Sequence, residues 1–129
     1  RDYYASRGLG DVYKRQVSMN GQEVYKFAVK TVPKVIEEAV KKAGLEVEDI
    51  DLFVLHQANL RIIESVAKRL HQPMEKFPTN LEECGNISAA SVPILLDNIN
   101  KRGMICEGKK IVLAGFGAGL TWGATVLVW

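Results

Sequence analysis

The chain has 129 residues, of which 47% are hydrophobic and 25% are charged, and its formal net charge is +2. This size and composition predict one soluble globular domain, and no apolar run has the length of a membrane span. Because there is also no basic-then-apolar leader, we expect a cytoplasmic protein. The net charge lies entirely in residues 1–16, so the remainder lacks a basic excess and is not expected to bind nucleic acid.

The first segment, RDYYASRGLGDVYKRQ, has neither helical nor strand periodicity. We expect residues 1–16 to be a flank that is foreign to the fold or disordered, with a native leader arm as the alternative. Residues 17–129 are then predicted to form the folded domain.

A long amphipathic helix is the first predicted element, from about Asn20 to Gly44. Apolar residues recur there at intervals of three and four, with lysines and glutamates between them. Gly44 is a typical stop, and Pro33 is expected to kink the helix. A short apolar run, Leu52–Leu55, follows and is typical of a buried strand.

The rest of the chain continues this alternation of helices and strands. Asn59 is a candidate N-cap for a second helix, and a third helix is expected from about Ser88 to Arg102. Between them, a short extended piece is expected near Phe77. The final segment, KKIVLAGFGAGLTWGATVLVW, predicts two strands joined by a glycine-rich turn.

The predicted order is α-β-α-β-α-β-β, which indicates an α/β fold. Its sheet is expected to be mixed and mostly parallel, covered by helices, with the last two strands adjacent and antiparallel. Ligands of such sheets bind at the carboxyl ends of strands. Three polar or glycine-rich motifs fall at or near such ends: HQAN from His56, CGNISAAS from Cys84, and GFGAG from Gly115.

Together these motifs predict a site that stabilises an oxyanion. His56 offers a neutral imidazole donor, Asn86 an amide donor, and the glycine turn its backbone N–H groups. Each feature also has a structural explanation. A single histidine at a strand end is more often structural, Asn86 suits a turn position, and the glycine turn can simply connect two strands.

Two other kinds of site fit the sequence poorly. For a dinucleotide fingerprint, GxGxxG, that begins at Gly115 or Gly117, the third glycine would fall on Leu120 or Trp122, and no helix is expected after it. A Cys-His hydrolase would need Cys84 or Cys106 as a low-pKa thiol beside His56, which nothing in the sequence indicates. The two cysteines lie outside any CxxC pair, so neither a metal site nor a disulfide framework is predicted.

Three motifs in order, HQANLRII, GNISAAS and GFGAGLTWGA, resemble the C-terminal half of β-ketoacyl-acyl carrier protein synthase III, the initiating condensing enzyme of bacterial type II fatty-acid synthesis. The resemblance runs from about Met19 to Trp129. It implies a thiolase-like fold and a decarboxylative Claisen condensation between an acyl-cysteine intermediate, formed from acyl-CoA, and malonyl-acyl carrier protein. It further implies a homodimer that uses these two substrates without a cofactor and has no membrane partner.

The resemblance also implies residue roles. His56 and Asn86 would hydrogen-bond the malonyl thioester carbonyl, and the backbone N–H of Ala118 would face the acyl-thioester oxygen. Asn59 and Gly21 match positions that line the pantetheine path. The residues expected to form the docking surface for the acidic acyl carrier protein are Lys26, Arg61 and Lys68, with Arg69 beside Lys68. From composition alone, these basic residues would be an ordinary solvated helix edge.

The sequence departs from the family pattern in one respect. Family chains are much longer and carry their nucleophilic cysteine in the N-terminal half, in a context that neither Cys84 nor Cys106 matches. We therefore expect a C-terminal half that works with a missing N-terminal half and a second subunit, and that is inactive alone. The alternative is a non-catalytic thiolase-like module that binds carrier protein or self-associates.

Overall fold

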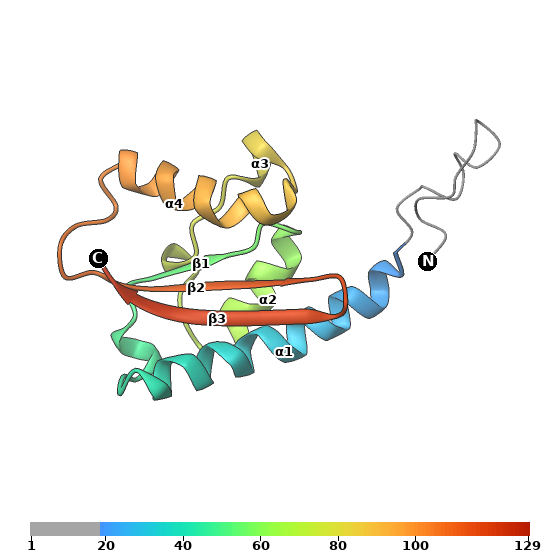
Figure 1. Ribbon diagram of the computed structural model, residues 1–129, viewed down its shortest axis with the longest axis horizontal. Helices are drawn as coiled ribbons and strands as arrows, with labels where there is room; N and C mark the ends of the chain where they lie inside the picture. Colours follow the sequence, from blue (N-terminus) through green and yellow to red (C-terminus); the bar gives the residue numbers. More distant parts are fainter. Residues whose placement is uncertain (1–18) are drawn as a thin grey trace, which may run out of the picture.

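The computed structural model describes residues 19–129, which form a three-stranded sheet with helices on both of its faces (Figure 1). The flank expected at residues 1–16 lies outside the described residues. Among residues 19–129, no helix combines the length and the apolar composition needed to cross a bilayer.

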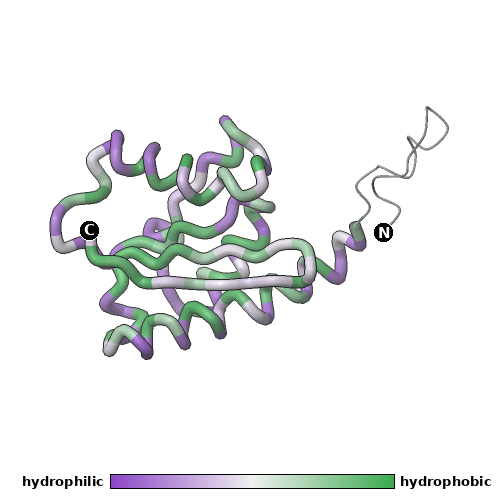
Figure 2. Tube along the Cα trace, viewed as in Figure 1, coloured by the Kyte–Doolittle hydropathy of each residue, from purple (hydrophilic) through white to green (hydrophobic). Residues whose placement is uncertain are grey.

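Helix α1 (Gly21–Lys42) begins where the sequence predicted, because the Asn20 side chain accepts a hydrogen bond from the Glu23 N–H at 3.3 Å and so caps the helix. It continues through Pro33 without ending there. Polar and apolar residues alternate along it (Figure 2), and one face is buried. The chain leaves the helix through Gly44, whose φ of +71° is readily adopted by glycine.

The strand order β1-β2-β3 confirms a mixed sheet. Strand β1 (Leu52–Leu55) pairs in parallel with β2 (Lys110–Gly117), and β2 pairs antiparallel with β3 (Thr121–Val128). The expected adjacency of the last two strands is therefore confirmed. One of the two pairings is parallel, so within the described residues the sheet is mixed without being mostly parallel.

The strand expected near Phe77 is absent from the described residues, so that part of the predicted order is wrong. The segment instead contains a 3₁₀ turn, Met74–Lys76, and a short helix α3 (Leu81–Cys84). The Phe77 ring is buried and stacks on Phe53 with ring centroids 4.6 Å apart. Phe77, which lies between Pro73 and Pro78, therefore anchors a loop and is not part of a strand.

Helices cover the two faces of the sheet as the alternation of strand side chains requires. Phe53 and Val112 point to the face covered by α1 and α2 (Leu60–Arg69). Val54 and Ile111 point to the opposite face, where they pack with residues of α4 (Ser91–Lys101). In Figure 1, α4 lies above the sheet and α1 below it. The third predicted helix is confirmed, with a 3₁₀ turn at its start.

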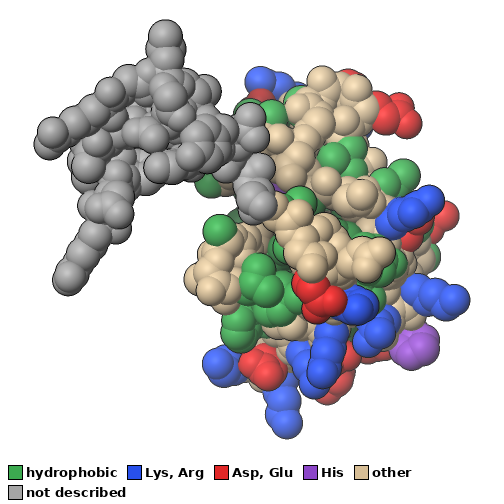
Figure 3. All heavy atoms as spheres, turned by 90° about the vertical axis from the view of Figure 1, so that its right-hand side faces the viewer, with side chains coloured by type: hydrophobic (Ala, Val, Ile, Leu, Met, Phe, Trp, Pro, Cys, Tyr) green, Lys and Arg blue, Asp and Glu red, His purple; other side chains and the backbone are tan. Residues whose placement is uncertain are grey.

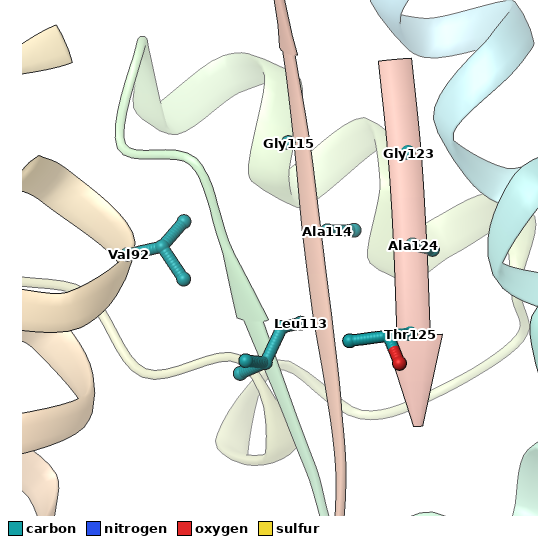
Figure 4. Close-up of a pocket in the computed structure, with 7 residues that line it drawn as sticks. All are labelled: Val92, Leu113, Ala114, Gly115, Gly123, Ala124 and Thr125. Carbon is teal, nitrogen blue, oxygen red and sulfur yellow. The ribbon is translucent and has the colours of Figure 1, made fainter. Parts of the chain in front are cut away.

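An open apolar hollow lies on the α4 side of β2 and β3 (Figure 4). Val92 of α4 forms one wall, and residues 113–115 and 123–125 form the floor. Gly115 and Gly123 face each other in the β2–β3 register, and a Cβ added to either would meet no atom within 4 Å. At both glycines the strand backbone therefore forms the floor of the hollow without a side chain above it.

Candidate active site

His56 follows the last residue of β1 and is fixed by its backbone. Its N–H donates to the carbonyl of Ala114 at 2.8 Å, which extends the pairing with β2 by one residue. The partly buried imidazole meets Phe116 edge to face, with ring centroids 5.3 Å apart. Since Phe116 belongs to GFGAG, the structure brings the first and third motifs together.

Ser91 joins the second motif to the same histidine. Its hydroxyl lies 2.6 Å from His56 Nδ1, and the Gln57 N–H donates to it at 3.3 Å. Ser91 is fully buried at the start of α4. Sequence reasoning missed it as a site residue, because a small serine before a helix also suits close packing. The signal was its spacing: Ser91, Leu95 and Ile99 form the buried face of α4.

The environment of His56 favours the neutral imidazole. Burial lowers the pKa of His56 below its ordinary value of 6.5, because desolvation penalises the charged form. At pH 7 the ring is therefore predominantly neutral and carries one N–H, on either Nδ1 or Nε2. A neutral ring can donate one hydrogen bond to a substrate oxygen without releasing a proton.

Gln57 holds the turn after β1 in place. Its side chain is fully buried, donates through Nε2 to the Leu55 carbonyl at 2.9 Å and accepts through Oε1 from the Asn80 N–H at 3.3 Å. Both ends of the amide are thus satisfied, as a buried polar side chain requires. Sequence reasoning did not single out this residue, although a glutamine two positions after a buried apolar run was a visible signal.

Asn86 lies in the exposed segment between α3 and α4. Its Oδ1 accepts from the Ser88 N–H at 3.1 Å, so the side chain forms a local turn. In the same segment, Gly85 (+63°) and Ser88 (+56°) have positive φ values. Because Oδ1 is engaged in this turn, the NH₂ group is the end of the amide suited to donate to a ligand.

Ala118 lies at the exposed tip of the β2–β3 hairpin. Its carbonyl accepts from the Thr121 hydroxyl at 3.0 Å, which closes the turn. Gly119 is required here, because its φ is +138° and an added Cβ would lie 2.8 Å from Thr121 Cγ2. The parallel pairing of β1 with β2 places this tip at the same end of the sheet as His56.

The two residues expected along the pantetheine path lie at helix starts. Asn59 caps α2, since its Oδ1 accepts from the Arg61 N–H at 2.8 Å. Gly21 is the exposed first residue of α1. The cap thus gives Asn59 a structural role, with its NH₂ group as the part suited to a ligand.

All the basic residues expected in the docking surface are exposed, on α1 and α2: Lys26, Arg61, Lys68 and Arg69. Lys26 pairs with Glu23 at 3.0 Å. The Tyr25 hydroxyl and Ser65 Oγ lie 2.9 Å apart and link the two helices. Lys and Arg side chains gather on the lower part of the face in Figure 3, beside hydrophobic ones.

The two cysteines occupy different parts of the surface. Cys84 ends α3 and is partly buried, with Asn80 Nδ2 at 3.6 Å from its sulfur. Cys106 is exposed in the loop that precedes β2. Both are free thiols.

Comparison with known proteins agrees with the resemblance in the motifs. Residues 40–129 match the family model described as 3-oxoacyl-[acyl-carrier-protein] synthase III C terminal. The β-ketoacyl-[acyl-carrier-protein] synthase III of Clostridium acetobutylicum is 51% identical over 114 residues, which are 88% of this chain and 35% of that protein. The chain thus spans about a third of the length of this relative.

Solved structures give the same result. The crystal structure of β-ketoacyl-[acyl carrier protein] synthase III from Thermus thermophilus superposes with a TM-score of 0.85 at 51% identity, over 87% of this chain and 35% of that one. A priming β-ketosynthase of the R1128 polyketide pathway has a TM-score of 0.83 at 36% identity, over 94% and 39%. The thiolase-like fold is therefore confirmed.

Proposed function

Because this chain belongs to the 3-oxoacyl-[acyl-carrier-protein] synthase III family, we propose that it supplies the malonyl-activating groups of a cytoplasmic condensing enzyme of fatty-acid synthesis. The observation that carries the proposal is the meeting of three motifs at His56. The imidazole contacts Phe116 of the glycine-rich hairpin and Ser91 at the start of α4. A partly buried, neutral histidine in this position suits stabilisation of an oxyanion.

The proposed reaction begins when the malonyl thioester loses CO₂. The electron pair of the broken C–C bond forms an enolate, whose oxygen accepts hydrogen bonds from His56 Nε2–H and the Asn86 NH₂ group. The enolate carbon then attacks the acyl-cysteine carbonyl, the new C–C bond forms, and the cysteine leaves as a thiolate. The N–H of Ala118 stabilises the oxyanion of this second step, and no further cofactor takes part.

The nucleophilic cysteine is proposed to lie outside this chain. Cys106 is exposed in a loop, and Cys84 ends a four-residue helix against Asn80. Neither lies at the N-terminus of a helix, where reactive cysteines are often found. Acyl-CoA would therefore load a cysteine in the part of the synthase that this chain does not span, and the second subunit would complete the enzyme.

The carrier of the malonyl group is proposed to be an acidic acyl carrier protein that docks on the basic surface of α1 and α2. Lys68 and Arg69 lie in the last turn of α2, where the helix dipole already favours cations. Arg61 instead lies in the first turn, where a cation is disfavoured by roughly 0.3–1 kcal/mol. Helix stability therefore does not explain why an arginine occupies position 61. This supports a role for Arg61 in docking.

The function is tested in a chimera in which residues 19–129 replace the matching C-terminal part of the Clostridium acetobutylicum relative. His56→Ala is expected to lower malonyl-dependent condensation by about two to three powers of ten, because one oxyanion donor is lost. Acylation of the nucleophilic cysteine, followed by mass spectrometry, should persist, since His56 acts on the second substrate.

His71→Ala is the matched control, because His71 is the other histidine of the chain and is exposed at the end of α2. Full activity is expected from it. Equal loss of acylation and condensation in His56→Ala would contradict the proposed division of roles. A folded chimera without any condensation would instead favour a module that only binds carrier protein.

A further inference from the structure

Ser91 has a hydroxyl whose single proton can be placed by its neighbours. Within residues 19–129, Oγ has two hydrogen-bond partners, the Gln57 N–H at 3.3 Å and His56 Nδ1 at 2.6 Å. The backbone N–H can only donate, so Oγ accepts from Gln57. The Gln57 side chain is itself held at both ends, which fixes the direction of this N–H.

The second contact admits two arrangements. If Nδ1 carried the imidazole proton, Oγ would accept from both partners, and its own O–H would have no acceptor in a fully buried position. A buried donor without a partner costs about 1–3 kcal/mol. If Nδ1 is unprotonated, the Ser91 O–H donates to it and every group at the contact is satisfied.

We propose that Ser91 is a positioning residue that holds His56 in the Nε2–H tautomer by donating its hydroxyl proton to Nδ1. The inference rests on the proposed function for its catalytic meaning, because the Nε2–H group is then the one that faces the substrate oxygen. Ser91 acts through His56 and touches no substrate. The hydroxyl thereby determines which ring nitrogen carries the proton, so that the imidazole donates from Nε2.

The contact also opposes protonation of the ring. An imidazolium would donate from Nδ1 to Oγ, which would turn the Ser91 O–H away from its acceptor. The hydroxyl therefore stabilises the neutral form in addition to the effect of burial. Removing the hydroxyl should raise the pKa of His56 as well as loosen its tautomer.

The tautomer can be observed directly in the 129-residue chain by ¹⁵N NMR of the histidine rings, since the chain has only two histidines. In the unmodified chain, Nδ1 of His56 should resonate as an unprotonated, hydrogen-bonded nitrogen and Nε2 as a protonated one. Exposed His71 serves as the internal reference and should not change in any variant.

Ser91→Ala should shift Nδ1 away from its hydrogen-bonded position, raise the population of the Nδ1–H tautomer, and raise the pKa of His56. Ser91→Thr keeps the hydroxyl and should restore all three. In the chimera, Ser91→Ala should lower kcat by about tenfold with little change in KM, as expected for one lost hydrogen bond.

A protonated Nδ1 in the unmodified chain would overturn the proposal, even if Ser91→Ala failed to fold. An unchanged tautomer and pKa in a folded Ser91→Ala variant would overturn it as well. If the NMR results hold while His56→Ala leaves condensation intact, Ser91 still positions the ring, and the proposed function of His56 is the part that fails.

Discussion

At the scale of single residues, the polar groups around β1 divide between those that build the fold and those left for a ligand. The side chains of Gln57 and Asp51 form all their observed hydrogen bonds with other groups of the chain. His56, Asn86 and Asn59 each use one polar atom in a hydrogen bond within the chain and retain another. The candidate site thus consists of side chains that are oriented by one end and available at the other.

Arg61→Glu should weaken use of malonyl-acyl carrier protein in the chimera, because it reverses a charge on the proposed docking surface. The expected effect is a lower kcat/KM for the carrier-bound substrate that is largest at low salt, where exposed charges are least screened. Priming from acyl-CoA should change little.

Lys41→Glu is the matched charge reversal, at the opposite end of α1 from Lys26. It should leave carrier-protein kinetics nearly unchanged. If Arg61→Glu behaved like Lys41→Glu at low salt, Arg61 would be an ordinary solvated helix residue.

Asp51 should make stability depend on pH. Its carboxylate accepts from the Lys110 N–H at 2.9 Å and pairs with Lys109 at 2.9 Å, and these contacts lower the pKa of Asp51 below 3.8. A depressed pKa stabilises the folded state above the unfolded pKa, and this contribution is lost as pH falls through the lower, folded value. The contacts of Asp51 with Lys109 and Lys110 also connect the start of β1 to the start of β2.

Asp51→Asn should therefore lower the urea midpoint at pH 7 and flatten the loss of stability below about pH 4. Asp97→Asn removes an exposed pair with Lys101 on α4 and should have little effect at pH 7. Parallel curves for Asp51→Asn and the unmodified chain in acid would show that Asp51 is not the group that titrates.

At the scale of elements, the sequence predicted what is set locally and missed what depends on distant contacts. Asn59 caps α2 as expected, and Asn20 caps α1 at the predicted start of that helix, because a cap needs only its own first turn. The backbone near Phe77 follows the position of the ring against Phe53, which lies more than twenty residues away in the sequence. No local pattern distinguishes such an anchor from a strand residue.

The candidate site shows the same division. His56 and Asn86 stood out because polar residues beside an apolar run and a glycine are visible locally. Ser91 was not assigned to the site, because its contact with Nδ1 depends on how α4 packs against the end of β1. Its helical spacing marked it as buried, and the partner that makes burial of its hydroxyl favourable is thirty-five residues away.

Phe77→Ala should test the loop anchor. Removing a fully buried ring that stacks on Phe53 is expected to cost about 3–5 kcal/mol of unfolding free energy, measured by urea denaturation. Phe77→Leu should recover much of it, because most of the apolar volume remains. A cost near that of a surface substitution would mean that the loop does not depend on this ring.

At the scale of the whole molecule, one face of the sheet is incompletely covered. The hollow over Gly115 and Gly123 is open, and β3 is an edge strand with exposed Trp122 and Val128. The chain spans about a third of its relatives, and the family model that it matches is the C-terminal one. If the chain works within a full-length synthase, as proposed above, another segment of that synthase is expected to cover this hollow.

Gly123→Val should then have opposite effects in two contexts. In the 129-residue chain it should be neutral or stabilising by about 0.5–1 kcal/mol, because a glycine within a strand is costly and the added Cβ meets no atom. In the chimera it should reduce the yield of folded enzyme and its activity, since the hollow would be filled.

Val128→Ile is the control, because it adds a methylene to the same strand at an exposed position outside the hollow. It should be tolerated in both contexts. A fully active Gly123→Val chimera would show that no segment of the synthase approaches the two glycines.

The parallel pairing of β1 with β2 also governs when the site can form. Its paired residues are nearly sixty positions apart, from Leu52 with Ile111 to Leu55 with Ala114. Closing such a span costs chain entropy before any contact repays it, and topologies rich in distant pairings fold slowly. During folding, we therefore expect the imidazole of His56 to gain its neighbours late, after the helices have formed. A refolding chain should recover its helical circular dichroism before the titration of His56 becomes native.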